Sequence, residues 1–372
     1  MARVTNPFKI QGFQGREYFC DRETELQDLI SHLLNDRNVV LHAWRRLGKT
    51  ALLNLLKDEI EKTQKANVIY VDFLGSKTLN QANGKIINAV YQHFGTLKVK
   101  GIQKSLQELL ASLGLAFSFN PITFLPEVET SIKSKKSSEN TLNEIGKFLN
   151  NQENLTTLIL DEFQEITKFN DVDAEPAFRF FAQTYPKVRI IFSGSERNLL
   201  KSMFTDKNRP FYKSTQLMGI EPIPLNLYNA FIQNHFGKRK ITIKIISDIY
   251  SWARGQTYTI QLQCNRLFEL NKSIEEADLH EIRESLLKQE APVFANYSNL
   301  LSDGQFNLLK AIAKDEAVQN PQASEFLLSH NLGAASTVRS ALKSLINKEL
   351  VIKEANNYLV HDVLFARWLQ RL

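Results

Sequence analysis

The sequence has few cysteines, no long apolar run and no strong excess of charge of one sign. Only two of its 372 residues are cysteines, and Cys20 and Cys264 lie too far apart for a CxxC motif or a paired set of metal ligands. A disulfide-stabilised fold is thereby excluded, and we expect a reduced, cytoplasmic protein. No segment reaches the roughly 18 consecutive apolar residues of a membrane span, and residues 1–19 lack the apolar centre of a signal peptide.

The length and composition are those of a globular protein with two or three domains. Hydrophobic residues make up 43% of the chain and charged residues 23%, which excludes collagen-like and disordered classes. The net charge of +6 is unevenly spread: residues 1–220 have 29 basic and 24 acidic side chains, residues 221–296 have nine of each, and residues 297–372 have eight and seven. A charge this small permits nucleic-acid binding without requiring it.

The first half of the chain has the pattern of a parallel α/β sheet. A strand over residues 38–42, a helix from Lys49 and a strand over residues 68–73 form a βαβ unit. Continuous apolar runs at 155–160 and 188–192 indicate strands covered on both faces. We also expect a helix with Asp21 as its N-cap, a hairpin within residues 117–132, and a solvated polar loop over residues 133–138.

Residues 43–50 read Ala-Trp-Arg-Arg-Leu-Gly-Lys-Thr and match the P-loop pattern G-x4-G-K-[ST] except at its first glycine, which is Ala43. Between a strand and a helix, the backbone N–H groups of such a loop face phosphate oxygens, the lysine reaches the β and γ phosphates, and the threonine hydroxyl binds Mg²⁺. The pattern therefore predicts ATP or ADP with Mg²⁺ as cofactors. The expected nucleotide-binding residues of the loop are Ala43, Trp44, Arg45, Arg46, Leu47, Gly48, Lys49, Thr50 and Ala51.

An acidic pair, Asp161-Glu162, directly follows the apolar run at 155–160. Seen alone, such a pair would equally fit a surface turn. At the end of a strand beside a P-loop, we expect Asp161 to bind Mg²⁺ together with Thr50, as in a Walker B motif, and Glu162 to orient or deprotonate the attacking water. No N-K-x-D motif is present to support guanine specificity.

Three further residues are candidates for the chemistry of hydrolysis, besides Lys49 and Glu162. Ser195 follows the run at 188–192, where a hydroxyl could sense the γ-phosphate, although a simple Ser-Gly turn fits as well. Arg197 and Arg209 lie further downstream, and either could stabilise transition-state charge in cis or across a subunit interface.

The last 75 or so residues predict three short helices and a β-hairpin, the order of a winged helix. Val338, Leu342 and Leu345 share the buried face of the third helix, whereas Arg339 and Lys343 point away from it as a possible recognition surface. The segment's small net charge argues against DNA binding, because phosphate neutralisation supplies most nonspecific affinity.

Several short motifs occur in order along the chain. They are Asn6-Pro7-Phe8, Phe19-x-x-Arg22-Glu23, Arg45-Arg46-x-Gly48-Lys49-Thr50, Leu160-Asp161-Glu162-Phe163-Gln164, Phe192-Ser193-Gly194-Ser195, Arg209-Pro210-Phe211-Tyr212 and His361-Asp362-x-Leu364-Phe365-x-x-Trp368. This set resembles the archaeal and bacterial STAND branch of the AAA+-like P-loop ATPases. The resemblance implies a five-stranded parallel core with the Walker B strand separated from the P-loop strand, a helical lid and a C-terminal winged helix.

The resemblance also implies that the region before the first helix lies over the adenine, which adds Phe19 and Arg22 to the expected nucleotide contacts. Besides Ala43, the chain departs from the family in its lid motif, G-x-P-x-x-x-Q, where Thr257 replaces the proline between Gly255 and Gln261. In related switch proteins this region couples nucleotide state to the winged helix.

We therefore predict an α/β P-loop ATPase core over residues 1–220, a helical lid over 221–296 and a winged helix over 297–372. The expected function is a slow, Mg-dependent ATP switch that relays its nucleotide state through the lid and the winged helix to a protein partner or another subunit. The alternatives are an ATP-regulated DNA-binding protein and a nucleotide-binding adapter without useful hydrolysis.

Overall fold

The computed structural model describes residues 5–63, 66–95, 100–113, 116–119, 126–129 and 135–372. The chain forms two compact units. One, the core unit, is Gly12–Glu221, and the other, the C-terminal unit, joins Pro222–Leu372 with the N-terminal segment up to Gln11.

The core unit is built on a five-stranded sheet in the order β2-β5-β6-β1-β7. Its strands are β1 (Val39–Ala43), β2 (Asn67–Asp72), β5 (Thr156–Asp161), β6 (Val188–Gly194) and β7 (Gln216–Ile220), and all neighbouring pairs are parallel. β6 lies between β1, which leads into the P-loop, and β5, which ends in Asp161. The predicted α/β fold with a separated Walker B strand is therefore confirmed.

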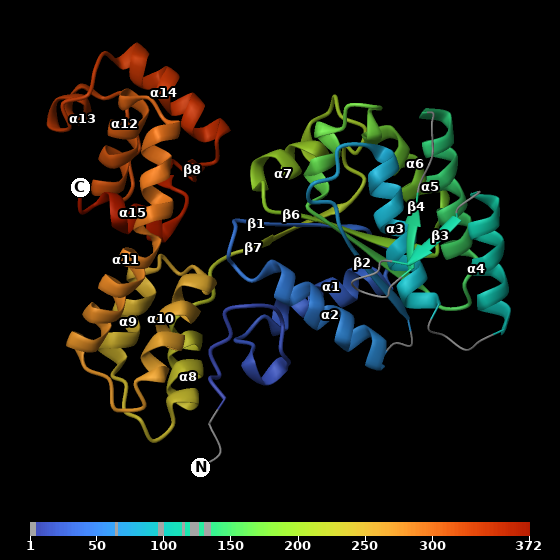
Figure 1. Ribbon diagram of the computed structural model, residues 1–372, viewed down its shortest axis with the longest axis horizontal. Helices are drawn as coiled ribbons and strands as arrows, with labels where there is room; N and C mark the ends of the chain where they lie inside the picture. The colour runs from blue at the N-terminus through green and yellow to red at the C-terminus, as the bar shows by residue number, and fades with distance from the viewer. Residues whose placement is uncertain (1–4, 64–65, 96–99, 114–115, 120–125, 130–134) are drawn as a thin grey trace. The chain divides into compact units, whose positions relative to one another are not determined.

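Helices cover both faces of this sheet (Figure 1). α1 (Glu23–Leu34) and α2 (Lys49–Thr63) pack on one face. The other face is covered by α3 (Leu79–Phe94), α5 (Lys135–Asn150), α6 (Ala174–Thr184) and α7 (Arg197–Thr205), with α4 (Lys100–Ser112) packed against α3 and α5. Alternate residues of β1 point to opposite faces of the sheet. Val39 and Leu41 belong to the apolar cluster with α1 and α2, and Val40 belongs to the cluster on the other face. A layered sheet of this kind brings the carboxyl ends of its strands to one edge.

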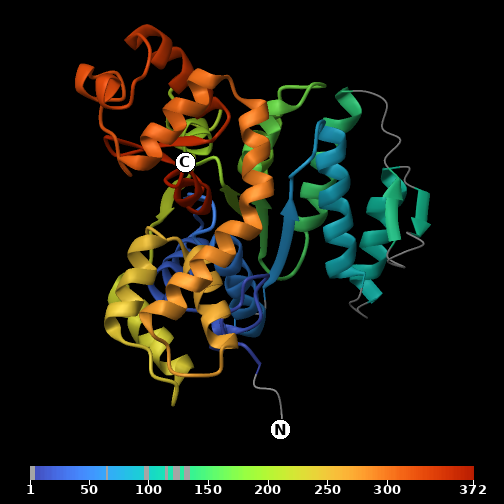
Figure 2. The ribbon, with the colours of Figure 1, turned by 60° about the vertical axis from the view of Figure 1, so that its left-hand side comes forward.

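The segment after α4 contains the predicted hairpin and corrects the predicted loop. β3 (Ala116–Phe119) pairs antiparallel with β4 (Pro126–Glu129), and the hairpin lies at the α3 side of the core unit (Figure 2). The prediction of a loop over residues 133–138 is wrong for residues 135–138, because α5 begins at Lys135. Residues 133–134 lie outside the described residues. Polar residues there form the start of a helix whose apolar positions, Leu142, Ile145 and Leu149, come later.

The C-terminal unit begins with four helices, α8 (Leu225–Phe236), α9 (Ile243–Trp252), α10 (Thr257–Glu269) and α11 (Glu276–Leu300). The winged-helix order follows as α12 (Asp303–Lys314), α13 (Ser324–Ser329), α14 (Ala335–Asn347), β8 (Val351–Glu354), β9 (Asn357–Val360) and α15 (Val363–Leu369). Figures 1 and 2 show α11 running from the lid helices into the winged helix. One apolar cluster contains Leu262 of the lid, Phe294 of α11 and Phe365 of α15. The predicted boundary between residues 296 and 297 thus falls inside α11, and the three-domain division stays a prediction.

The N-terminal segment belongs to the C-terminal unit, whereas the sequence had placed it in the core. Phe8 is fully buried, and its ring packs against those of Phe231, Phe236 and Phe268 at centroid distances of 5.3 to 6.1 Å. Asn265 Nδ2 also donates a hydrogen bond of 2.7 Å to the Phe8 carbonyl. The contacts of this segment are therefore with the lid helices.

Among the described residues, no helix combines the length and the apolar character needed to cross a membrane.

Candidate functional site

The P-loop connects the end of β1 to the start of α2. Ala43 is fully buried, pairs with Ile220 in the sheet and lacks a positive φ, so an alanine fits there without strain. Arg46 and Gly48 do have positive φ values, 68° and 89°, and turn the chain into the helix at Lys49. The first N–H groups of α2 have no acceptor within the helix, and the helix dipole adds partial positive charge there. This combination is suited to a phosphate group.

Lys49, at the start of α2, lies at the centre of a buried polar cluster with residues of β5 and β6. Its Nζ donates to Asp161 Oδ1 at the end of β5 and to Ser193 Oγ in β6, the latter over 2.9 Å. Ser193 Oγ in turn donates to Asp161 Oδ1 over 2.7 Å. All three residues are less than one tenth exposed. Lys49 and Asp161, predicted from motifs 112 positions apart, are thus in direct contact.

Ser193 and Tyr70 complete this cluster and were absent from the predicted site. Tyr70 Oη, from β2, donates to Asp161 Oδ2 over 2.5 Å. Burial opposes ionisation of Asp161, but the charge of Lys49 and hydrogen bonds from Lys49, Tyr70 and Ser193 outweigh it and hold the pKa of Asp161 below its usual range. The carboxylate is therefore charged at neutral pH. The sequence contains a signal for Ser193, because it is the first polar residue after the apolar run at 188–192. Tyr70 belongs to no recognisable motif.

Glu162 follows in a left-handed conformation, with φ 50° and ψ 40°. This turn brings its Oε2 to Ser195, whose Oγ donates over 2.9 Å and whose backbone N–H donates over 3.3 Å. Gln164 Nε2 donates to the same oxygen over 2.5 Å. The structure therefore brings together Glu162 and Ser195, two of the predicted catalytic residues.

The backbone of Gly194 is packed tightly against this group. A Cβ added there would lie 2.0 Å from Gln164 Oε1 and 3.3 Å from Leu200 Cδ2. Gln164 is buried, so its carboxamide has little room to move. A glycine is thus required between Ser193 and Ser195 to keep Gln164 in contact with Glu162.

The residues before α1 lie against the P-loop. Arg22 is buried, pairs with Glu25 and donates from Nη2 to the Leu47 carbonyl over 3.3 Å. Arg22 is also the N-cap of α1, so the prediction of Asp21 as N-cap is wrong. Both residues have left-handed φ values, 78° and 56°, and consecutive strained residues of this kind cluster at binding sites. Phe19 packs edge-on against Phe13, with centroids 6.0 Å apart.

Arg197 lies beside the P-loop on α7. Its Nη2 is 2.8 Å from Glu221 Oε1, and its guanidinium carbon is 5.5 Å from the centroid of the Trp44 ring. His42 of β1 interacts electrostatically with Arg197. Burial is the main cause that lowers the pKa of His42 to about 4, and the charges of Arg197 and Lys201 lower it further. His42 is therefore neutral at physiological pH.

Arg209 makes a bidentate pair with Glu175 of α6, and its Nη1 is 3.3 Å from Ser202 Oγ. Both arginines thus have carboxylate partners of the core unit, Glu221 and Glu175. Their roles toward a transferred phosphate stay predictions.

The donor set fits a magnesium ion bound together with a nucleotide. In P-loop sites the protein supplies a hydroxyl and a carboxylate, while phosphates and waters complete the octahedron. Thr50 is exposed at the first turn of α2, and Asp161 is ionised. Within the described part of the chain, no group of three or more His, Cys, Asp or Glu side chains could hold a metal ion by itself. A metal at this site would therefore depend on phosphate oxygens.

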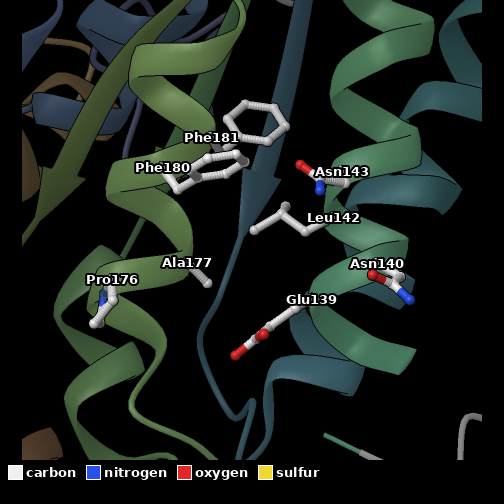
Figure 3. A pocket seen from close by; sticks show the side chains of 8 residues that line it. All are labelled: Glu139, Asn140, Leu142, Asn143, Pro176, Ala177, Phe180 and Phe181. Carbon is white, nitrogen blue, oxygen red and sulfur yellow. The ribbon is translucent and has the colours of Figure 1, made fainter. Parts of the chain in front are cut away.

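A separate cavity of about 280 Å³ lies between α5 and α6 (Figure 3). Its apolar lining includes Leu142, Phe181 and the exposed Phe180, and Glu139 also lines it. No residue of the Lys49 cluster lines it. This cavity is thus distinct from the predicted phosphate site.

Gly255 and Thr257 of the lid motif form the turn into α10 and the start of that helix. Gly255 has φ 69°, and a Cβ there would lie 2.8 Å from Pro222 Cβ. Thr257 is the first residue of α10, after Gln256 as N-cap. The first helical position is where proline is favoured for its fixed φ, and threonine can also adopt it.

Comparisons with known proteins agree with this fold. A family model described as a probable winged helix domain matches residues 292–371. A comparison with curated proteins found no match. Among solved structures, a Walker-type ATPase of Pyrococcus abyssi is 17% identical, with a TM-score of 0.67, covering 98% of this chain and 99% of that one.

Two structures from Aeropyrum pernix are also similar. The ORC2 protein, in ADPNP-ADP complexes, is 14% identical with a TM-score of 0.60, covering 99% of this chain and 96% of that one. The ORC1 protein, in complex with DNA, is 12% identical with a TM-score of 0.51, covering 95% and 92%. The chain therefore has the parallel-sheet α/β fold of a P-loop ATPase, followed by a C-terminal winged helix.

Proposed function

We propose that this protein is a Mg-dependent ATP-binding and ATP-hydrolysing switch. The observation that carries this proposal is the contact of Lys49 Nζ with both Asp161 and Ser193, where the ends of β5 and β6 meet the start of α2. A P-loop lysine and an acidic strand end are two of the parts with which P-loop ATPases bind a triphosphate and its metal.

In the proposed site, the N–H groups at the start of α2 bind the phosphates, and Lys49 turns its ammonium from Asp161 to the β and γ phosphates. Thr50 and Asp161 would hold Mg²⁺, which when bound would neutralise charge on the phosphate oxygens. Arg22 and Phe19 position the region before α1 beside the P-loop. Each step uses a residue whose contacts lie within the core unit.

Glu162 is proposed to orient the attacking water and accept its proton. In the described conformation, its Oε2 accepts hydrogen bonds from Ser195 and Gln164. These two residues hold the carboxylate beside the end of β6. Ser195 is proposed to report a change at the γ-phosphate through this contact.

The core unit offers a short path from the P-loop to its own last residue. Arg197 contacts the ring of Trp44 and the carboxylate of Glu221, which precedes Pro222. We therefore propose that a conformational change in the P-loop alters the position of Glu221, the last residue of the core unit.

The C-terminal unit has a partly buried arginine network that joins the lid and the winged helix. Arg367 of α15 donates from Nε and Nη2 to the Trp252 carbonyl over 3.1 and 2.9 Å and pairs with Glu316. Arg254 also pairs with Glu316 and donates to the Val360 carbonyl over 3.0 Å. Burial, with the charges of Arg254 and Arg283, lowers the pKa of Arg367 to about 10, so it stays charged at neutral pH. We propose that lid and winged helix respond together, toward a protein partner or a second subunit.

DNA binding through the winged helix is the second candidate. Val338, Leu342 and Leu345 are buried in α14, and Arg339 and Lys343 are exposed on its outer face. Arg339 Nε donates to Gln322 Oε1 over 3.0 Å, so the guanidinium is held at that surface. Two basic side chains supply little phosphate neutralisation, which favours the protein partner.

The Lys49→Ala variant should bind ATP about tenfold to a hundredfold more weakly, because it loses a charge-assisted phosphate contact. Isothermal titration calorimetry with a non-hydrolysable ATP analogue measures the change. Lys62→Ala, an exposed position of the same helix, should leave the affinity unchanged. Equal affinities of wild type and Lys49→Ala would refute the P-loop assignment, provided that circular dichroism shows the variant folded.

The Glu162→Gln variant should hydrolyse ATP about 10² to 10⁴ times more slowly, because an amide cannot accept the proton of the attacking water. Its ATP affinity should stay within about twofold of wild type, since Lys49 and Asp161 remain. Phosphate release under single-turnover conditions measures this rate. The matched control is Glu165→Gln in the 3₁₀-helix Phe163–Lys168, of which Glu162 is the N-cap. Turnover that is equal in all three proteins would exclude Glu162 as the base.

The Arg367→Met variant should uncouple the winged helix from the lid, because it removes the contacts with Trp252 and Glu316. Hydrogen exchange with and without an ATP analogue should show a nucleotide-dependent change in α12 and α15 of the wild type that is lost in the variant. Arg371→Met removes an exposed pair with Glu284 and should keep the response. A winged helix that does not respond to nucleotide in the wild type would contradict the relay.

If the winged helix binds DNA, the logarithm of the binding constant should fall linearly with the logarithm of salt concentration. Replacing Arg339 or Lys343 by alanine should reduce that slope by about one each. Fluorescence anisotropy with duplex DNA tests both statements. Binding that is insensitive to salt and to both substitutions would remove this candidate.

A further inference from the structure

Tyr70 contacts the acidic strand end from the neighbouring strand. In the parallel pairing of β2 with β5, Tyr70 lies opposite Ile159, two positions before Asp161. Its half-buried side chain spans this offset, and Oη donates to Asp161 Oδ2 over 2.5 Å. A tyrosine donor on a carboxylate makes a short, charge-assisted hydrogen bond of this length.

The two carboxylate oxygens of Asp161 have different partners. Oδ1 accepts from Lys49 Nζ, from Ser193 Oγ over 2.7 Å and from the Glu162 N–H over 3.0 Å. Among the described residues, Oδ2 accepts from Tyr70. Asp72, which lies opposite Asp161 in the pairing, turns its Oδ1 to the N–H of Leu74 over 2.8 Å and is exposed. The orientation of the Asp161 carboxylate is thus fixed from one side by the P-loop lysine and from the other by Tyr70.

These two restraints differ in what happens when a nucleotide binds. In the proposed function, Lys49 moves to the phosphates, so Oδ1 loses a donor at the moment when the metal needs it. Tyr70 belongs to β2, an edge strand of the sheet whose six residues all pair with β5, the strand that ends in Asp161. The position of its hydroxyl relative to Asp161 therefore does not depend on Lys49. Tyr70 thus keeps the carboxylate plane in place after Lys49 leaves.

We propose that Tyr70 is a positioning residue for magnesium: by holding Oδ2, it keeps Oδ1 of Asp161 directed toward the metal and so sets the Mg²⁺ concentration that nucleotide binding requires. This inference rests on the proposed function. It assigns Tyr70 no contact with the nucleotide, so metal-free nucleotide binding should not depend on it.

The test compares Tyr70→Phe with wild type in nucleotide binding rather than in turnover. Binding of a fluorescent ADP analogue is titrated in EDTA and at a series of Mg²⁺ concentrations. We expect the Mg²⁺ concentration for half-maximal tightening to rise about threefold to tenfold, which corresponds to the net contribution of one typical hydrogen bond. Affinity in EDTA should stay within about twofold. Tyr185→Phe is the matched control, because it removes a buried 2.9 Å hydrogen bond to the Asn143 carbonyl in the same unit, and it should leave both values unchanged.

A double-mutant comparison separates positioning from a general structural effect. In an Asp161→Asn background, Tyr70→Phe should cause no further shift in the Mg²⁺ requirement, because Tyr70 acts through the carboxylate. A shift of equal size in that background, or an equal loss of affinity with and without Mg²⁺, would overturn the proposal. If Tyr70→Phe does not fold, Tyr70→His replaces it, and the same shift is expected because an imidazole is too short to bring its N–H to the position of the phenol oxygen.

The outcomes also separate this inference from the proposed function. Tightening of nucleotide by Mg²⁺ in the wild type, with an identical Mg²⁺ requirement in Tyr70→Phe, would overturn the role of Tyr70 and leave the ATP switch in place. A wild type that binds no nucleotide in either condition would overturn both.

Discussion

One buried charge pair constrains the arrangement of the strand ends in the core unit. Lys49 and Asp161 come from opposite sides of β6 and meet at the carboxyl edge of the sheet, each less than one tenth exposed. Two buried charges are tolerated only when each satisfies the other and further donors complete the hydrogen bonds. Ser193 and Tyr70 complete them here. The pair is therefore weak support for stability by itself, but it defines the relative positions of β5, β6 and the start of α2.

The apolar layer behind the pair keeps those strand ends in place. Phe163 follows Glu162 and packs against Phe192, Phe204 and Phe211 at centroid distances of 4.5 to 6.2 Å. Phe192 directly precedes Ser193, so polar and aromatic residues alternate along the chain at the edge of the sheet. Such a packed aromatic layer leaves little room for a side chain to shift. The left-handed turn at Glu162 is thus held between a rigid apolar layer and the polar cluster.

Much of this arrangement could be predicted from the sequence, and the exceptions have a common cause. Lys49, Asp161 and Glu162 were found because their motifs fix both residue type and place on a strand or helix. β7 was missed because its edge position leaves Gln216, Leu217 and Gly219 exposed, which removes the apolar run that marks a buried strand. Tyr70 was missed because its role depends on which strand lies beside β5, and strand order cannot be read from the periodicity of one strand.

The burial of Phe8 among the lid helices has a consequence for how the chain folds. Asn6 Nδ2 donates to the Asn265 carbonyl over a sequence separation of 259 residues. During synthesis the first segment of the C-terminal unit leaves the ribosome long before its partners exist, while every residue of the core unit is made in between. Domains generally fold as units during synthesis. The core unit can therefore be complete while Phe8 is still exposed, and the arrival of α8 and α10 provides the site that removes this aromatic ring from water.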